Sequence, residues 1–220
     1  MYVPIGAYYP PELLADSQSD ELLFFTTLAP FKGLELLLEA FRQLRTEWPG
    51  LRLTIAGTEH PRFPDYTRTV KEGCGEMEGV QWLGQVAEDD VINLFRRAKI
   101  VVLPYTASTG ASSVMYQAAS WGRAIAGSNL NEMQWLAKEN GLRIEFFENR
   151  NVESLRNTIR NLMASPALRL EQVENNFRVI QNLRIELTCH RYLQAFNRAL
   201  EKRNSPIRIP LSLPVNLESV

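Results

Sequence analysis

Residues 22–57 read LLFFTTLAPFKGLELLLEAFRQLRTEWPGLRLTIAG and contain a strand, a helix and a second strand in direct succession. The runs 22–28 and 51–57 are apolar and have the length of buried strands. Between them, residues 33–48 place apolar side chains at helical spacing and end at a Pro-Gly pair, which stops helices. Two apolar strands joined by a helix over short loops predict a parallel pair with a crossover helix.

The same alternation continues to residue 147. Further strands are expected at 80–84, 100–105, 124–128 and 142–147, and further helices at 65–74, 87–98, 111–122 and 131–140. The strands are apolar along nearly their whole length, which indicates that helices cover both faces of the sheet. The sequence thus predicts an α/β fold with a doubly wound, mainly parallel, six-stranded Rossmann-like sheet, which binds ligands at the carboxyl ends of its strands.

The two ends of the chain differ from this pattern. Residues 1–20 include a proline-rich extended segment and are expected to be a lead-in or interdomain linker, as in the middle of a longer chain. Residues 151–203 read as three consecutive helices. We therefore expect a Rossmann-like domain over 21–202 that includes these C-terminal helices, followed by a proline-containing tail over 203–220.

The composition argues against several functions. Of the 220 residues, 45% are hydrophobic and 22% are charged, which is enough for one compact core. The net charge of −1 gives no electrostatic reason to expect binding to nucleic acid or to an anionic membrane. Cys74 and Cys189 have no metal-binding or redox spacing. With no signal peptide and no apolar run of roughly 18 residues, we expect a cytoplasmic protein with at most peripheral membrane association.

Residues 104–127, PYTASTGASSVMYQAASWGRAIAG, pass from a strand end through small and hydroxyl residues into a helix. Backbone amides at a helix N-terminus bind anions, and the carboxyl end of a parallel strand is where such sheets bind ligands. The plainer interpretation is a tight turn without a ligand. The location of this loop favours an anion site.

Several segments, in order and spacing, match one family. They are VPIG (3–6), FFTTLAPFKGLELLLEAF (24–41), LRLTIAG (51–57), VQWLGQV (80–86), AKIVVLPY (98–105) and YQAASWGRAIAGSNLNEM (116–133). Over roughly its first 200 residues the chain resembles the C-terminal, nucleotide-sugar-binding domain of GT-B glycosyltransferases, specifically the large retaining family four, or glycosyl transferases group 1. The resemblance implies that the chain is one half of a GT-B fold.

The resemblance also implies a glycosyltransferase, hexosyltransferase-like activity. Family members transfer a sugar from a nucleoside diphosphate sugar (UDP-, GDP- or ADP-sugar) to an acceptor with retention, and they need no metal or other cofactor. The acceptor binds to a second domain that this chain does not contain. The expected partners are therefore a nucleotide sugar and an acceptor-binding GT-B domain, in the same longer chain or in a separate subunit. The chain alone is expected at best to bind a donor.

The family's motifs carry over residue by residue. The donor diphosphate would contact Lys32, Gly110, Ala111, Ser112 and Ser113, the sugar and ribose would contact Thr109, Gln117 and Glu132, and the base would lie near Gly84, Gln85 and Val86. No catalytic residue is assigned, and no metal site is expected.

Three positions depart from the family pattern. The arginine that accompanies the lysine is missing, since Thr27, or Ala29 in the other register, stands in its place. The two glutamates are replaced by Thr109 and Gln117. A hydrogen bond to a charged group is worth roughly 1.5–3 kcal/mol, so the missing arginine would weaken diphosphate binding about 10- to 100-fold. Two functions stay open: a glycosyltransferase donor domain, or a degenerate, non-catalytic GT-B domain that acts as a binding or regulatory module.

Other conspicuous residues have plainer interpretations. The acidic run 88–90 suits the first turn of a helix better than a catalytic or metal site. Tyr105 and Trp82 are expected to be core or rim aromatics, near which a nucleobase could stack, and His60 is expected to be a loop histidine near the ligand edge.

Overall fold

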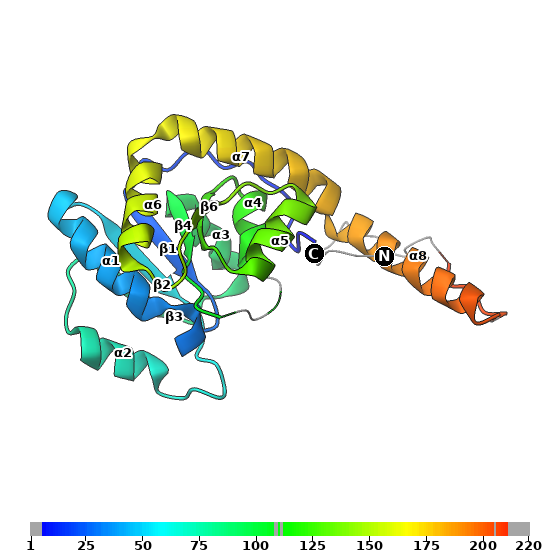
Figure 1. Ribbon diagram of the computed structural model, residues 1–220, viewed down its shortest axis with the longest axis horizontal. Coiled ribbons are helices and arrows are strands. Elements are labelled where there is room, and N and C mark those ends of the chain that lie inside the picture. Colours follow the sequence, from blue (N-terminus) through cyan, green and yellow to red (C-terminus); the bar gives the residue numbers. More distant parts are fainter. Residues whose placement is uncertain (1–5, 108–109, 111, 205, 211–220) are drawn as a thin grey trace.

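The computed structural model describes residues 6–107, 110, 112–204 and 206–210, and it has a central sheet with helices on both faces (Figure 1). The strands are β1 (Glu21–Phe25), β2 (Arg52–Ala56), β3 (Val80–Gly84), β4 (Ile100–Leu103), β5 (Ala124–Ser128) and β6 (Glu145–Phe147). The α-helices are α1 (Leu34–Glu47), α2 (Tyr66–Cys74), α3 (Glu88–Arg97), α4 (Ser113–Ser120), α5 (Asn131–Asn140), α6 (Val152–Ala164), α7 (Pro166–Ile180) and α8 (Ile185–Lys202). Two short 3-10 helices are η1 (Pro30–Lys32) and η2 (Gln181–Leu183).

The sheet is parallel throughout, in the order β3-β2-β1-β4-β5-β6. The chain starts in the middle of the sheet, winds outward through β2 and β3, and then returns to the other side of β1 to form β4, β5 and β6. β1 pairs with β2 on one side and with β4 on the other, where Leu22 lies opposite Ile100. This topology confirms the doubly wound Rossmann-like sheet. It places the switch in winding direction between β1 and β4, where such sheets open a crevice.

The core has two layers, one on each face of the sheet. Alternate residues of β1 belong to different layers, since Leu22 and Phe24 pack with α1, α2 and α6, and Leu23 packs with α3, α4 and α5. These three side chains are at most 1% exposed. Burial on both faces explains why the strands are apolar throughout instead of alternating with polar residues.

Four strands are shorter than the sequence predicts: β2 lacks one residue at each end, β4 ends at Leu103 instead of residue 105, and β1 and β6 differ most. β1 ends at Phe25 instead of residue 28, because beyond Phe25 the backbone pairing with the neighbouring segment is no longer continuous. The Leu28 N–H still donates to the Thr58 carbonyl, which follows β2 (2.7 Å). β6 begins at Glu145 instead of residue 142, because Leu142 closes the C-terminal turn of α5 with an N–H bond to the Ala137 carbonyl (2.8 Å). An apolar run therefore marks a strand better than it marks where the strand ends.

The segment 6–20 is fastened along the domain. Ala7 N–H donates to the Leu183 carbonyl of η2 (2.6 Å), close to where α8 begins. Further along, the Asp16 carboxylate pairs with Arg169 of α7 at 2.8 Å. The lead-in thus contacts the same side of the domain that the C-terminal helices cover.

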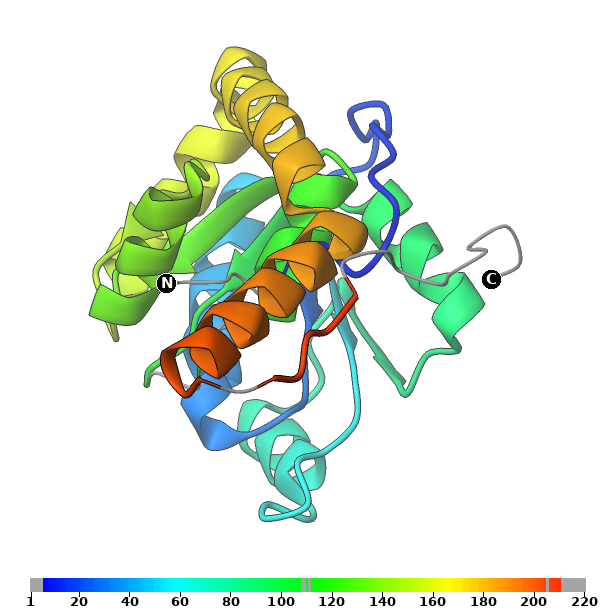
Figure 2. The same cartoon turned by 90° about the vertical axis from the view of Figure 1, so that its right-hand side faces the viewer.

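Helix α8 leaves the body of the domain (Figure 1). It exposes the apolar side chains of Leu187, Tyr192 and Phe196, which are 45%, 41% and 54% exposed. Residues 206–210 return beside it (Figure 2), where the Asn197 side chain bonds both the N–H and the carbonyl of Ile209 at 2.8 Å. Among the helices that the structure describes, none combines the length and the hydropathy needed to cross a membrane.

Gly33 fixes the loop between β1 and α1, and its substitution provides a test of the fold. Its φ is +70°, and a Cβ at this position would lie 1.9 Å from the carbonyl oxygen of Pro104, just beyond β4. We expect Gly33→Ala to lower the free energy of unfolding by at least about 2 kcal/mol, because alanine is strained in this conformation and clashes with backbone. Chemical denaturation measures the change.

Gly73→Ala is the matched control for this substitution. Gly73 lies in α2, and nothing lies within 4 Å of an added Cβ. This change should raise the free energy of unfolding by about 0.5–1 kcal/mol through helix propensity. Equal losses in the two variants would contradict a special role for the contact with Pro104.

Candidate functional site

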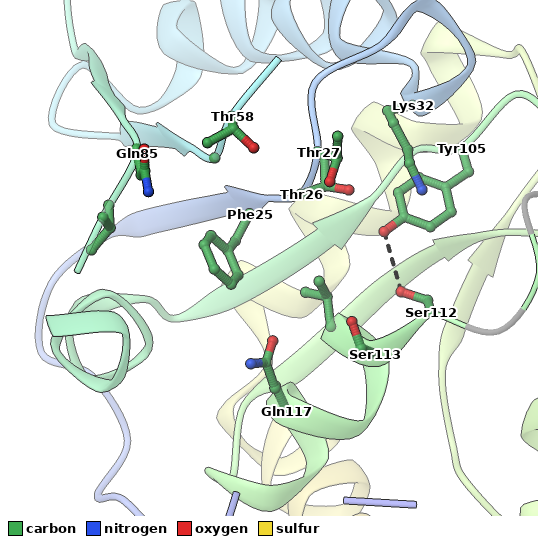
Figure 3. A pocket seen from close by; sticks show the side chains of 13 residues that line it. Phe25, Thr26, Thr27, Lys32, Thr58, Gln85, Tyr105, Ser112, Ser113 and Gln117 are labelled. Carbon is green, nitrogen blue, oxygen red and sulfur yellow. Dashed lines mark hydrogen bonds between the residues drawn. The ribbon is translucent and has the colours of Figure 1, made fainter. Parts of the chain in front are cut away.

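A pocket of about 470 Å³ opens at the carboxyl edge of the sheet, between the two halves of the winding (Figure 3). Its walls come from the ends of β1, β2 and β4, the loop after β3, η1 and the first turns of α4. The lining residues are Phe25, Thr26, Thr27, Lys32, Gly57, Thr58, Gln85, Val86, Tyr105, Ser112, Ser113, Val114 and Gln117.

Lys32 supplies the charge of this pocket, since every other lining residue that the structure describes is neutral. Its Nζ atom lies 4.0 Å from the centre of the Tyr105 ring and 5.7 Å from the centre of the Phe31 ring. Burial lowers the pKa of Lys32, because the protonated amine loses hydration. The pocket thus presents an ammonium group against an aromatic face, a geometry in which cation and ring attract.

Tyr105 lies beside Lys32 and connects it to α4 (Figure 3). Its side chain is 3% exposed, and its hydroxyl lies 3.2 Å from Ser112 Oγ, just before the first residue of α4. Thr26, just beyond β1, is a second polar neighbour of this hydroxyl. Burial raises the pKa of Tyr105, and the polar contacts with Ser112 and Thr26 act in the opposite direction. The ring is therefore held between η1, β1 and α4 with a neutral hydroxyl.

The N-terminus of α4 opens into the same space. Ser112 is the N-cap in an extended conformation (φ −86°, ψ 110°), and its side chain makes no capping bond to the helix. Ser113 and Gln117 are four positions apart, which places them on one face of α4, and both line the pocket. The aligned peptide dipoles of a helix make its N-terminus attractive to negative charge. The helix thus contributes amides, hydroxyls and one carboxamide.

Most of the predicted site residues that the structure describes meet here. Lys32, Ser112, Ser113 and Gln117 line one part of the pocket, and Gln85 and Val86 line another. Gly84, Gly110 and Glu132 are not among the lining residues. Gly84 ends β3 and accepts a hydrogen bond from Gly57 N–H (2.7 Å), and Glu132 lies in the first turn of α5. Thr109 and Ala111 fall outside the described residues.

Sequence reasoning missed part of the lining. Thr26 and Thr58 lie just beyond β1 and β2, and both face the pocket. Thr27, which stands where the family has its arginine, is also a lining residue and is exposed. The available signal was positional, because residues that directly follow parallel strands gather at one edge of the sheet. The link from Tyr105 to Lys32 and Ser112 had no signal in the sequence pattern.

These groups are suited to holding an anion. One ammonium, a helix N-terminus and several hydroxyls can bind a negatively charged molecule that also carries hydroxyl groups. Among the described lining residues, none is a carboxylate or an imidazole that could act as a general base at neutral pH. Within the ranges given above, no group of three His, Cys, Asp or Glu residues is placed to hold a metal ion.

Sequence comparison gives one family. The family model of glycosyl transferases group 1 matches residues 19–165, about two thirds of the chain. The lipopolysaccharide 1,2-N-acetylglucosaminetransferase of Salmonella typhimurium is 27% identical over 113 residues, which cover 49% of this chain and 29% of that enzyme.

Solved structures share the fold at low sequence identity. The C-terminal domain of a glycosyl transferase group 1 family protein from Francisella tularensis is similar with a TM-score of 0.63 and 15% identity, over 81% of this chain and 97% of that one. A glycosyltransferase from Rickettsia africae gives a TM-score of 0.71 at 18% identity, over 84% of this chain and 49% of that one. HepE from Anabaena, in complex with UDP, gives 0.69 at 18% identity, over 82% and 49%. The chain spans about half the length of these two larger proteins.

The environment of Lys32 predicts an unusual titration. Because burial lowers its pKa, the Lys32 amine should lose its proton at lower pH than an ordinary lysine. Reductive methylation with a carbon-13 label and NMR titration measure this, and the signal that disappears in Lys32→Ala identifies the group. A titration in the ordinary lysine range would contradict the buried placement of the amine.

Proposed function

The chain belongs to the glycosyl transferases group 1 family, and we propose that it is the donor-binding, C-terminal half of a retaining GT-B glycosyltransferase of family four. It would take a sugar from a nucleoside diphosphate sugar and, together with an acceptor-binding half, transfer it to an acceptor. The observation that carries this proposal is the meeting of Lys32 and the N-terminus of α4 in one pocket at the switch point of the sheet.

We expect each part of the donor to contact a different part of the pocket lining. A diphosphate carries at least two negative charges, and the Lys32 ammonium, the α4 N-terminus and the hydroxyls of Ser112 and Ser113 lie where they would bind them. Gln117 offers a neutral carboxamide to sugar or ribose hydroxyls. Gln85 and Val86, which follow β3, would lie next to the base. The same cation and helix dipole would stabilise the leaving diphosphate, so this proposal includes no metal.

Transfer also requires an acceptor half, in the same longer chain or in a separate subunit. Reaction between two substrates gains from holding both in one cleft, and the lining residues of this pocket would hold only the donor. The chain spans about half of the larger proteins to which it is similar, which supports a missing half. The apolar side chains of Leu187, Tyr192 and Phe196, exposed on α8, are a surface on which that half could pack.

The neutral lining favours a second candidate function. Thr27 and Gln117 stand where the family pattern has an arginine and a glutamate, and both face the pocket. A degenerate, non-catalytic domain that binds a nucleotide weakly, or serves as a binding or regulatory module, would have such a lining. Nucleotide affinity distinguishes the two candidates.

Calorimetric titration with UDP, GDP and ADP is the direct test of donor binding. HepE, similar in fold, was solved with UDP and with UDP and glucose, so UDP is the first choice. We expect one of the three nucleotides to bind with a micromolar to low millimolar Kd. Lys32→Ala should weaken this binding about 10- to 100-fold, because it removes a charged hydrogen-bond donor.

Lys71→Ala serves as the matched control for the titration. Lys71 also lies over an aromatic ring, with its Nζ 4.9 Å from the centre of Trp82, but it does not line the pocket. This variant should bind the nucleotide like the unmodified chain. Absence of binding for all three nucleotides would favour the non-catalytic module.

Restoring the family's charged residues gives a second test. Thr27→Arg with Gln117→Glu should tighten nucleotide binding at least about tenfold, since each change replaces a neutral contact by a charge-assisted one. Thr69→Arg with Gln134→Glu, at exposed positions outside the pocket, is the charge-matched control. No gain in the first variant relative to the control would count against a working donor site.

A further inference from the structure

We infer that Tyr105 is a positioning residue for the donor diphosphate, holding the Lys32 ammonium against its ring and tying it to the first turn of α4 through its hydroxyl. The inference rests on the proposed function, and it assigns a role to a side chain that the sequence indicated only as a core or rim aromatic.

Three structural elements meet on this side chain. The Lys32 Nζ atom of η1 lies 4.0 Å from the ring centre, the Ser112 Oγ atom beside α4 lies 3.2 Å from the hydroxyl, and Thr26 beyond β1 is a further polar neighbour of the hydroxyl. Each of these three residues lines the pocket. A single rigid side chain therefore fixes the cation, the strand end and the helix start relative to one another.

The backbone around this contact is equally constrained. Thr106 N–H donates to the Phe31 carbonyl (2.9 Å), and Gly33 approaches the Pro104 carbonyl where a Cβ would lie only 1.9 Å away. The loop that carries Lys32 is thus hydrogen-bonded to one sequence neighbour of Tyr105 and packed closely against the other. The close approach of ammonium and ring follows from this backbone geometry.

An aromatic face suits the task of holding a lysine for an anionic ligand. The negative face of the ring attracts the ammonium, more strongly where water is excluded, yet it leaves the N–H groups that point away from it for other acceptors. A flexible lysine loses side-chain entropy when it is fixed, and holding it before the ligand arrives reduces that cost on binding. Tyr105 would then raise affinity without touching the donor.

The plainer alternative is that Tyr105 only fills the core. It belongs to the hydrophobic layer that contains α3, α4 and α5, and it is 3% exposed. A purely structural residue would affect nucleotide binding equally whether or not Lys32 is present. A positioning residue would act through Lys32.

A double-mutant cycle separates these alternatives. Binding of UDP, or of GDP or ADP if that is the nucleotide that binds, is measured by calorimetry for Tyr105→Leu, Lys32→Ala and the double variant. We expect Tyr105→Leu to weaken binding about three- to tenfold, the range of a partly desolvated cation–ring attraction. In the Lys32→Ala background the same change should cost only the smaller part of this loss that comes from removing the hydroxyl. Equal losses in the two backgrounds would overturn the inference.

Tyr105→Phe separates the ring from the hydroxyl. It keeps the aromatic face and removes the hydrogen bond to Ser112, so its smaller loss should persist in the Lys32→Ala background. If thermal denaturation shows that the leucine variant is not folded, a variant with a fluorinated phenylalanine at position 105 takes its place. This variant is compared with Tyr105→Phe. The fluorine atoms weaken the negative face at nearly constant volume, so the same Lys32-dependent loss is expected.

The NMR titration of Lys32 tests the inference without a donor. Because the ring favours the protonated amine, weakening the aromatic face should lower the pKa of Lys32 further. An unchanged or raised pKa in the fluorinated variant would overturn the inference. If the unmodified chain binds no nucleotide while this pKa falls as expected, the proposed donor site has failed and the contact between Tyr105 and Lys32 stands.

Discussion

The burial of β1 on both faces is the constraint on which the rest of the structure depends. Its alternate side chains enter two separate core layers, and its two edges pair with strands from opposite halves of the chain. A strand in that position forces the chain to reverse its winding direction beside it. The reversal separates the loops that follow β1 and β4, and the pocket opens between them. The site is thus a geometric result of where one apolar strand lies.

The sequence predicted this architecture because the order of strands and helices follows from the alternation of short apolar runs with segments of helical periodicity. Both patterns can be read from the sequence without knowing which residues touch in space. The expected bounds of β1 and β6 were wrong by up to three residues, because pairing beyond Phe25 continues only as one isolated bridge at Leu28 and because Leu142 closes the last turn of α5. Within the site, Lys32 and Gln117 could be placed from the motifs, and both line the pocket. The contact between Tyr105 and Lys32 could not, since it depends on how two distant loops approach each other in space.

The lining of the pocket is unusual in how little charge it carries. Only Lys32 is charged among the lining residues described, and the remaining polar groups are hydroxyls, carboxamides and backbone. Neutral hydrogen bonds contribute about 1 kcal/mol each to binding. Such a site therefore relies on the helix dipole and on a cation that is already held in position before the ligand binds. A domain that binds its ligand in this way would discriminate less between anions than one with several fixed charges. This is consistent with either a weak donor site or a module that has kept its scaffold.

The contact between Ala7 and Leu183 has a consequence for how this domain relates to any chain around it. Gly6, the first described residue, approaches Thr188 of α8 so closely that a Cβ would lie 2.5 Å from its hydroxyl oxygen. The segment that enters the domain therefore lies beside the start of the helix that leaves its body (Figure 1). A force applied to either segment would act on the domain at the same place, and the sheet would not lie between the two points of attachment.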